Sequence, residues 1–272
     1  MSFEQRGRMP LDYQPSALPG SALRFRGPLD VDRGPAVVCI GSSATFGRFI
    51  DAPFAAQLDK RLDLPVLNLG VINAGVDVMV NDPAIAANVA NAEAVVMQIT
   101  GAHTLTNRFY SVHPRRNDRF LGASAMLRTI YPQVDFTEFH FIRHLLSHLQ
   151  MESSDRFEIV RTELEIAWVA RMRKFLNSLA LPVHLLWLAN RRPDAVGGTD
   201  LAQHPLFITM KMLEVVGQDA ASLTIAAPLA DDRHDGLDGK FFGPSEEAAA
   251  RMLPGPGLHS MAAGKLLKHL SP

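Results

Sequence analysis

The chain has 272 residues, a length that fits one large domain or two small ones. Its 47% apolar and 20% charged residues lie near the averages of soluble globular proteins. Lysine plus arginine number 27 and aspartate plus glutamate 28, so the net charge of −1 argues against binding nucleic acid or an anionic membrane through bulk charge.

Residues 1–35 predict an irregular N-terminal arm, because they are rich in Pro, Gly, Arg and Ser and lack periodicity. They also lack an apolar run of signal-peptide length. Nowhere do 18 apolar residues follow one another, so we expect no transmembrane segment. The lone Cys39 cannot form a disulfide within the chain. Together these features predict a cytoplasmic protein.

Residues 36–272 alternate short apolar runs with helical stretches. The predicted strands are 36–40, 65–69, 94–99, 182–189 and 222–227. The predicted helices are 53–62, one starting at 82–83, 136–150, 155–179, 206–216 and 261–270. Continuous apolar strands between helices indicate a parallel sheet that is covered on both faces. We therefore predict one three-layer α/β/α domain with about five parallel strands in the flavodoxin-like order 2-1-3-4-5.

Ligands of open parallel sheets bind beyond the carboxyl ends of the strands. At the first such end the sequence is GSSATFG, from Gly41 to Gly47. A serine on a strand-to-helix turn is exposed near free backbone N–H groups, which suits a nucleophile. Serine is also an ordinary turn and capping residue, so this segment alone leaves both interpretations open.

Three further segments strengthen the catalytic interpretation: 68–75, 101–103 and 258–264. With the first turn, they resemble the four sequence blocks of the SGNH (GDSL-like) hydrolase superfamily. The first block of that family reads Gly-Asp-Ser-x-Thr-x-Gly, and here Ser42 replaces the Asp. The resemblance implies an SGNH-like fold and a serine esterase or acyltransferase, with Ser43 as nucleophile and His259 as its base.

The same resemblance implies an oxyanion hole. Its expected members are Ser43, Asn73, Gly75 and His103. His103 stands where the family has an Asn, and a neutral imidazole can still donate one hydrogen bond.

One departure from the family concerns the base. The family carries an Asp three residues before the catalytic His, and Pro256 stands there. Losing that carboxylate can cost ~10⁴ in rate. The upstream carboxylates that could replace it are Asp231, Asp232, Asp235, Asp238 and Glu246. The chain also resembles an alphaproteobacterial family with a His-Pro-Arg-Arg-Asn-Asp-Arg-Phe segment, here 113–120, which assigns no activity.

Four arginines within that region form a second candidate site: Arg108, Arg115, Arg116 and Arg119. Guanidinium groups suit a carboxylate, sulfate or phosphate, so we expect these arginines to bind an anionic substrate. The alternatives are a solvated loop that pairs with acids such as Asp118 or Glu138, or an intersubunit salt-bridge strip.

Three histidines, His140, His144 and His148, share one predicted helix. Their spacing lets at most two bind one metal, because three in a row drift around the helix. We interpret them as a partly buried face and assign no metal ligand and no cofactor. Cys39 lies in a predicted core strand and is interpreted as packing.

The leading hypothesis is an enzyme that cleaves or transfers an O-acyl group of a small-molecule, glycan or lipid-type substrate that can be anionic. The competing hypothesis is a catalytically degenerate SGNH-like protein that binds an anionic ligand or partner. A third is group transfer from a phosphate or sulfate donor at 41–47, which the absence of a P-loop Lys weakens. Nucleic acid is not an expected partner, and homo-oligomer formation is left open.

Overall fold

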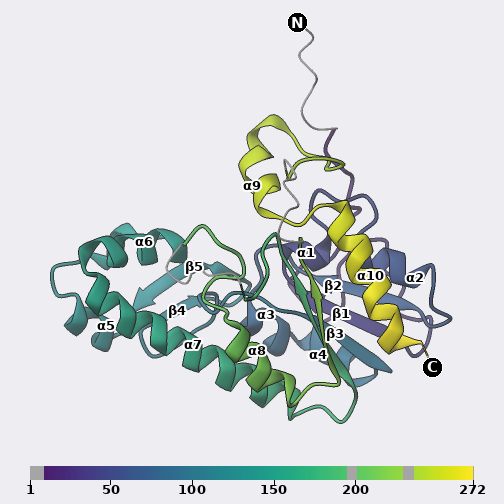
Figure 1. Cartoon of the computed structure of the whole chain (residues 1–272), viewed down its shortest axis with the longest axis horizontal. Coiled ribbons are helices and arrows are strands. Elements are labelled where there is room, and N and C mark those ends of the chain that lie inside the picture. The colour runs from purple at the N-terminus through teal and green to yellow at the C-terminus, as the bar shows by residue number, and fades with distance from the viewer. Residues whose placement is uncertain (1–8, 195–200, 229–235, 272) are drawn as a thin grey trace, which may run out of the picture.

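The computed structural model describes residues 9–194, 201–228 and 236–271. At its centre is a five-stranded parallel sheet with the order β2-β1-β3-β6-β7 (Figure 1). The strands are β1 (Val37–Gly41), β2 (Val66–Gly70), β3 (Ala94–Gln98), β6 (Val183–Leu188) and β7 (Ser222–Ala226). Counted within this sheet, the order is the predicted 2-1-3-4-5, and the predicted fold class is confirmed.

The three central strands are buried along their whole length, as their continuous apolar sequences predict. The register pairs Gly41 of β1 with Gly70 of β2. It also pairs Ile40 with Met97 of β3. The carboxyl ends of these strands, and the segments that follow them, therefore meet at one edge of the sheet.

Helices cover both faces of the sheet (Figure 1). One face packs on α2 (Phe54–Asp59) and α10 (Pro256–Leu270), where Cys39 of β1 lies. Burial raises the pKa of this thiol, in agreement with a packing role. The largest apolar cluster includes residues of the helices α3 (Val76–Asn81), α4 (Pro83–Ala90), α7 (Ser154–Leu176) and α8 (Met210–Gly217).

An antiparallel hairpin that the sequence did not predict follows β3. It consists of β4 (Tyr110–His113) and β5 (Arg116–Ala123). It lies with α5 (Ala125–Ile130) and α6 (Ile142–Glu152) in a lobe beside the main sheet (Figure 1). The helix predicted over 136–150 is instead the short 3-10 helix η1 (Phe136–Glu138) followed by α6. The remaining helices are α1 (Ser43–Phe46), η2 (Pro244–Glu246) and α9 (Glu247–Met252).

Residues 9–35 contain no helix or strand apart from an isolated bridge between Ser16 and Phe25. This segment is nevertheless part of the core, because Phe25 is fully buried. Arg26 donates hydrogen bonds to the carbonyls of Gly47 and Ile50, at 2.8 and 2.7 Å. The predicted arm therefore anchors the chain just after α1.

Two further features bear on the predicted sites. The rings of His144 and His148 pack around Phe139, with centroids 5.0 and 5.2 Å away. Within 9–194, 201–228 and 236–271, no group of three or more His, Cys, Asp or Glu could hold a metal ion. The same described ranges contain no helix long and apolar enough to cross a membrane.

Candidate active site

The turn between β1 and α1 is clamped by one glutamine. Gln98 Oε1 accepts the N–H of Ser42 and of Thr45, both at 3.0 Å, and the Thr45 hydroxyl at 2.7 Å. A Cβ on Gly41 would lie 2.1 Å from Thr45 Oγ1, so only glycine fits there. These contacts hold Ser43 at the start of α1.

The loop after β2 packs directly on α1. Asn68 Nδ2 donates to the Thr45 carbonyl at 2.8 Å. A Cβ on Gly70 would lie 2.2 Å from the Phe46 nitrogen, so a side chain at Gly70 would push β2 away from α1. Asn68 and Gly70 thus hold the loop after β2 against the Ser43 turn.

Ser43 makes two hydrogen bonds to Asn73. Its Oγ accepts the Asn73 N–H at 3.0 Å and donates to Asn73 Oδ1 at 3.4 Å. Asn73 has a φ of +59°, in the left-handed region that asparagine tolerates better than most side chains. This backbone conformation allows one residue to offer both groups to Ser43.

Ser43 and Asn73 line a cavity of about 420 Å³, within the range of small-molecule sites. Much of its wall is apolar: Ala44, Ile99, Phe141, Ile142, Leu188, Ala189, Met252 and Leu253. Polar groups enter from the other segments: Thr100, His103, Asp118, Arg48, Arg143 and His204. Their gathering at the carboxyl ends of β1, β2 and β3 is the predicted location of a ligand.

His103 contributes an imidazole to this cavity. A Cβ on Gly101 would lie 2.6 Å from its Nδ1, so glycine lets the ring lie against the backbone. Nδ1 is buried without a hydrogen-bond partner among the described residues, whereas Nε2 is not enclosed in this way. Burial, and then the charges of Arg143 and His204, hold the pKa of His103 well below its usual range. The ring is therefore neutral at neutral pH.

His204 lies beside His103, with the ring centroids 6.5 Å apart. Arg143 Nη2 lies 2.8 Å from Nε2 and 3.1 Å from Nδ1 of His204, so both ring nitrogens face the guanidinium. Burial, followed by Arg143 and Arg191, lowers the pKa of His204 to about 3. This contact occupies the ring atoms that a catalytic base would need.

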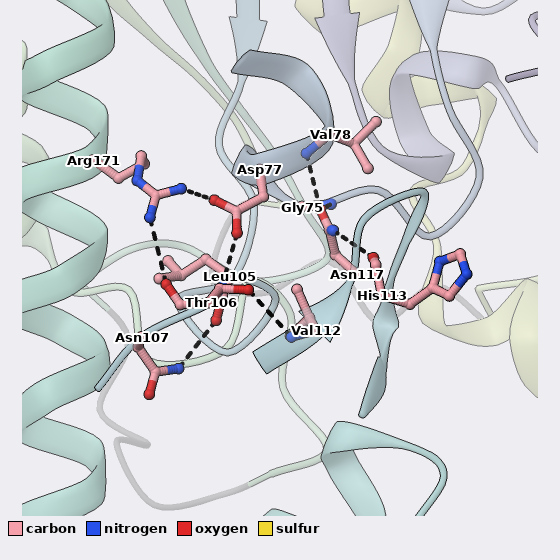
Figure 2. A network of polar contacts seen from close by, with 10 residues as sticks. All are labelled: Gly75, Asp77, Val78, Leu105, Thr106, Asn107, Val112, His113, Asn117 and Arg171. Carbon is pink, nitrogen blue, oxygen red and sulfur yellow. Dashed lines mark hydrogen bonds and ion pairs between the residues drawn. The ribbon is translucent and has the colours of Figure 1, made fainter. Parts of the chain in front are cut away.

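The Gly75 N–H, which was expected to bind the oxyanion, is already engaged in a hydrogen bond. It donates to Asn117 Oδ1 at 2.9 Å, and Asn117 also accepts the Val78 N–H at 3.1 Å (Figure 2). Because β5 already occupies this N–H, the expectation that Gly75 binds the oxyanion is corrected. The Ser43 N–H, by contrast, makes no hydrogen bond in the described chain.

His259 is not placed as the base of Ser43. Its Nδ1 accepts the Phe54 N–H at 3.1 Å, and its ring stacks on Phe54. The neutral ring therefore carries its proton on Nε2 and cannot accept one there. Complete burial, then Lys240 and Arg26, lowers the pKa of His259 to about 3. The expected role of His259 is corrected to a structural one.

The position of His259 follows from the residues just before it. Pro256 begins α10 at its first turn, which places His259 inside the helix rather than on a loop. Of the carboxylates proposed to replace the family's Asp, Glu246 pairs with Arg48 at 2.9 Å and Asp238 is exposed. Asp231, Asp232 and Asp235 lie outside the described residues.

None of the four predicted arginines lines the cavity. Arg108 Nε donates to the buried Glu163 at 2.8 Å, and Arg115 is exposed. Arg116 lies 3.7 Å from Asp118, and Arg119 lies over the Phe141 ring. The guanidinium groups that do line the cavity belong to Arg48 and Arg143, so the predicted anion site is corrected.

The hairpin instead contributes the Asp118 carboxylate to the cavity wall, a role that the sequence did not predict. Asp118 Oδ2 accepts a hydrogen bond from Asn73 Nδ2 at 3.2 Å, and its Oδ1 is buried without a partner in the described ranges. One indication of this role was present in the sequence. Asp118 lies in the His-Pro-Arg-Arg-Asn-Asp-Arg-Phe segment, 113–120.

The fold and the cavity thus define a class of protein: an α/β protein with a serine-lined cavity at the carboxyl ends of its parallel strands. The chain belongs to the family described as Domain of unknown function (DUF6473), whose model matches residues 1–272. The comparison with curated proteins found no match.

Three solved structures are similar to this chain at low identity. The lipase Lip_vut3 from a goat rumen metagenome has a TM-score of 0.45 and 13% identity, over 86% of this chain and 96% of its own. The α/β hydrolase LAE5 from the metagenome of Lake Arreo, Spain, has a TM-score of 0.40 and 15% identity, over 86% and 94%. A catalytic mutant of Axe2, an acetylxylan esterase from Geobacillus stearothermophilus, has a TM-score of 0.38 and 14% identity, over 88% and 95%.

Proposed function

We propose that this protein is a serine esterase or acyltransferase that accepts the acyl group of an oxygen ester on Ser43. The observation that carries the proposal is the Asn73 N–H, which is directed at Ser43 Oγ at 3.0 Å on the wall of the cavity. A donor fixed in this position, together with the Ser43 N–H, is suited to stabilise the oxyanion of a tetrahedral intermediate.

Attack by Ser43 on the ester carbon releases the hydroxyl proton, and we assign His103 Nε2 as its acceptor. Its low pKa keeps the imidazole neutral, as a general base must be before it takes a proton. The proton then passes from Nε2 to the oxygen of the leaving alcohol, and the acyl group remains on Ser43. The family resemblance implies a different role, in which His103 only donates to the oxyanion.

We expect slow turnover. No carboxylate or other described group bonds to His103 Nδ1, so nothing fixes its tautomer or stabilises the imidazolium. The loss of such a partner costs ~10⁴ in rate in complete triads. Formation of the acyl-enzyme is therefore a more sensitive measurement than steady-state turnover.

The lining of the cavity supports a substrate with an apolar acyl chain, because Ile99, Leu188 and Leu253 contribute to its wall. An anionic group on the substrate would meet Arg48 or Arg143 rather than the arginines of the hairpin. A small-molecule ester and a lipid-type ester both satisfy these conditions.

The test is hydrolysis of p-nitrophenyl esters of increasing chain length by the wild type and by Ser43→Ala. We expect a pre-steady-state burst of nitrophenol from the wild type only, and faster release when an alcohol is added if the enzyme is a transferase. His103→Asn keeps a hydrogen-bond donor but cannot accept a proton. Loss of the burst in His103→Asn supports the base role, whereas retention supports the oxyanion role.

Ligand binding without turnover is the second candidate. It is favoured by the position of His259, whose Nδ1 is already bonded to Phe54 and whose ring therefore cannot serve Ser43. A fatty carboxylate that binds by calorimetry, combined with no burst from any ester, would support this candidate over the enzyme.

A further inference from the structure

The Ser43 hydroxyl is connected to a carboxylate through a single amide. Ser43 Oγ donates to Asn73 Oδ1 at 3.4 Å, and Asn73 Nδ2 donates to Asp118 Oδ2 at 3.2 Å. The three side chains come from α1, the loop after β2 and strand β5. None of the sequence blocks that define the serine turn contains Asp118.

An asparagine side chain can present either its oxygen or its nitrogen to a neighbour, but a carboxylate only accepts hydrogen bonds. Asp118 therefore selects the orientation in which Nδ2 faces it and Oδ1 faces Ser43. In the reversed orientation both Asn73 N and Nδ2 would donate toward Ser43 Oγ, and the hydroxyl proton would lose its acceptor. The acceptor-only carboxylate of Asp118 thus keeps Nδ2 away from Ser43 Oγ and leaves a lone pair of that oxygen free for attack, and the hydroxyl turns from Asn73 Oδ1 to His103 Nε2 as it reacts.

Asp118 is held in place by its neighbour on β5. Asn117 is fully buried and accepts the Gly75 and Val78 N–H groups while its Nδ2 donates to the His113 carbonyl at 3.0 Å (Figure 2). The hairpin is therefore bonded to both ends of the short segment 73–78, which begins with the residue that contacts Ser43.

A second set of contacts secures this arrangement from the other side. Asp77, which is buried, pairs with Arg171 of α7 and accepts the Thr106 N–H at 2.8 Å (Figure 2). The Thr106 hydroxyl in turn accepts the Val112 N–H of β4 at 3.2 Å. Helix α7, the loop after β3 and the hairpin are thereby fixed to the start of α3.

We propose that Asp118 is a positioning residue, which orients the Asn73 amide and through it the Ser43 hydroxyl. The proposal rests on the proposed function, in which Ser43 is the acyl acceptor. It assigns the hairpin a part in the reaction, although the hairpin supplies no group that contacts the reacting atoms.

The first test measures the rate at which a fluorophosphonate labels Ser43. Loss of a charge-assisted hydrogen bond predicts labelling of Asp118→Ala about 10- to 100-fold more slowly than the wild type. Asp118→Asn can offer Asn73 either an oxygen or a nitrogen, so it selects the amide orientation less strictly, and we expect a rate between those of the wild type and Asp118→Ala. Asp155→Ala, an exposed aspartate of α7, is the matched control and should label like the wild type.

A double-mutant cycle separates positioning from a general loss of structure. Asn73→Ala and Asp118→Ala act on the same chain of contacts, so the double variant should label no more slowly than the slower single variant. Multiplying effects, or wild-type labelling by Asp118→Ala, would overturn the proposal. So would equal rates for Asp118→Asn and Asp118→Ala.

A second readout does not depend on reactivity. In ¹⁵N-labelled protein, the Asn73 side-chain NH₂ should exchange slowly with water in the wild type, rapidly in Asp118→Ala and at an intermediate rate in Asp118→Asn. If no variant is labelled but this pattern holds, the proposed function fails and the positioning of Asn73 stands. Unchanged exchange in Asp118→Ala would overturn the positioning whatever the labelling shows.

Discussion

The cavity at the sheet edge and the apolar layer between α2 and α10 each contain a buried, neutral histidine. At the cavity, His103 keeps Nε2 open while Nδ1 lies against Gly101. In the apolar layer, His259 uses Nδ1 to accept the Phe54 N–H. Burial lowers both pKa values, so the ability to react depends on which ring nitrogen is left open rather than on burial.

The largest expected effect distinguishes these two rings directly. His103→Ala should slow acylation of Ser43 by about 10²–10⁴, the usual contribution of a general base. His259→Gln can still accept the Phe54 N–H through its side-chain oxygen, so its acylation rate should stay within about threefold. Burst amplitudes and rates with an aryl ester measure both. Slow acylation of His259→Gln together with fast acylation of His103→Ala would show that His259, and not His103, serves Ser43.

Two glycines extend the comparison of the cavity with the α10 layer to the free energy of unfolding. Gly70→Ala places a Cβ 2.2 Å from the Phe46 backbone, and we expect it to lower the free energy of unfolding by about 3 kcal/mol or more. Gly264→Ala in α10 meets no atom within 4 Å and should raise it by about 0.5–1 kcal/mol, because alanine favours a helix. Urea unfolding measures both, and a destabilised Gly264→Ala would contradict this packing of α10.

The pH dependence of stability provides a third test. A histidine titrates near pH 6.5 in the unfolded chain and near 3 in the folded state at His259. Between these values the unfolded chain binds one proton more, so His259 lowers the free energy of unfolding as the pH falls below 6.5. His259→Gln should remove about 1.4 kcal/mol per pH unit from this slope near pH 5. An unchanged slope would show that His259 is protonated in the folded state.

The smallest expected effect concerns the hairpin arginines. Arg115→Ala combined with Arg116→Ala should change the free energy of unfolding by less than about 1 kcal/mol, because exposed ion pairs contribute little. Affinity for a fatty carboxylate should also be unchanged, since neither side chain lines the cavity. Weakened binding, measured by calorimetry, would show that these arginines belong to the ligand site.

The sheet was predictable because its strands are continuous apolar runs that break at glycine, and those breaks fall where Gly41, Gly70 and Gly101 allow close approach. The hairpin was not, because its strands carry several charged residues and its register shifts between Ser111 and His113. Pro256 could have predicted that a helix begins there and that His259 lies within it, because proline favours the first turn of a helix. The contacts of Asn117 and Asp118 with the segment 73–78 join distant parts of the chain, and local sequence does not encode them.

Labelling with a fluorophosphonate followed by peptide mapping tests the central claim most directly. We predict one adduct, on Ser43, that is absent in Ser43→Ala, forms about 10²–10⁴ more slowly in His103→Ala and forms at about the wild-type rate in His259→Gln. An unlabelled wild type, or an adduct on another serine, would contradict the assignment of Ser43 as the acyl acceptor.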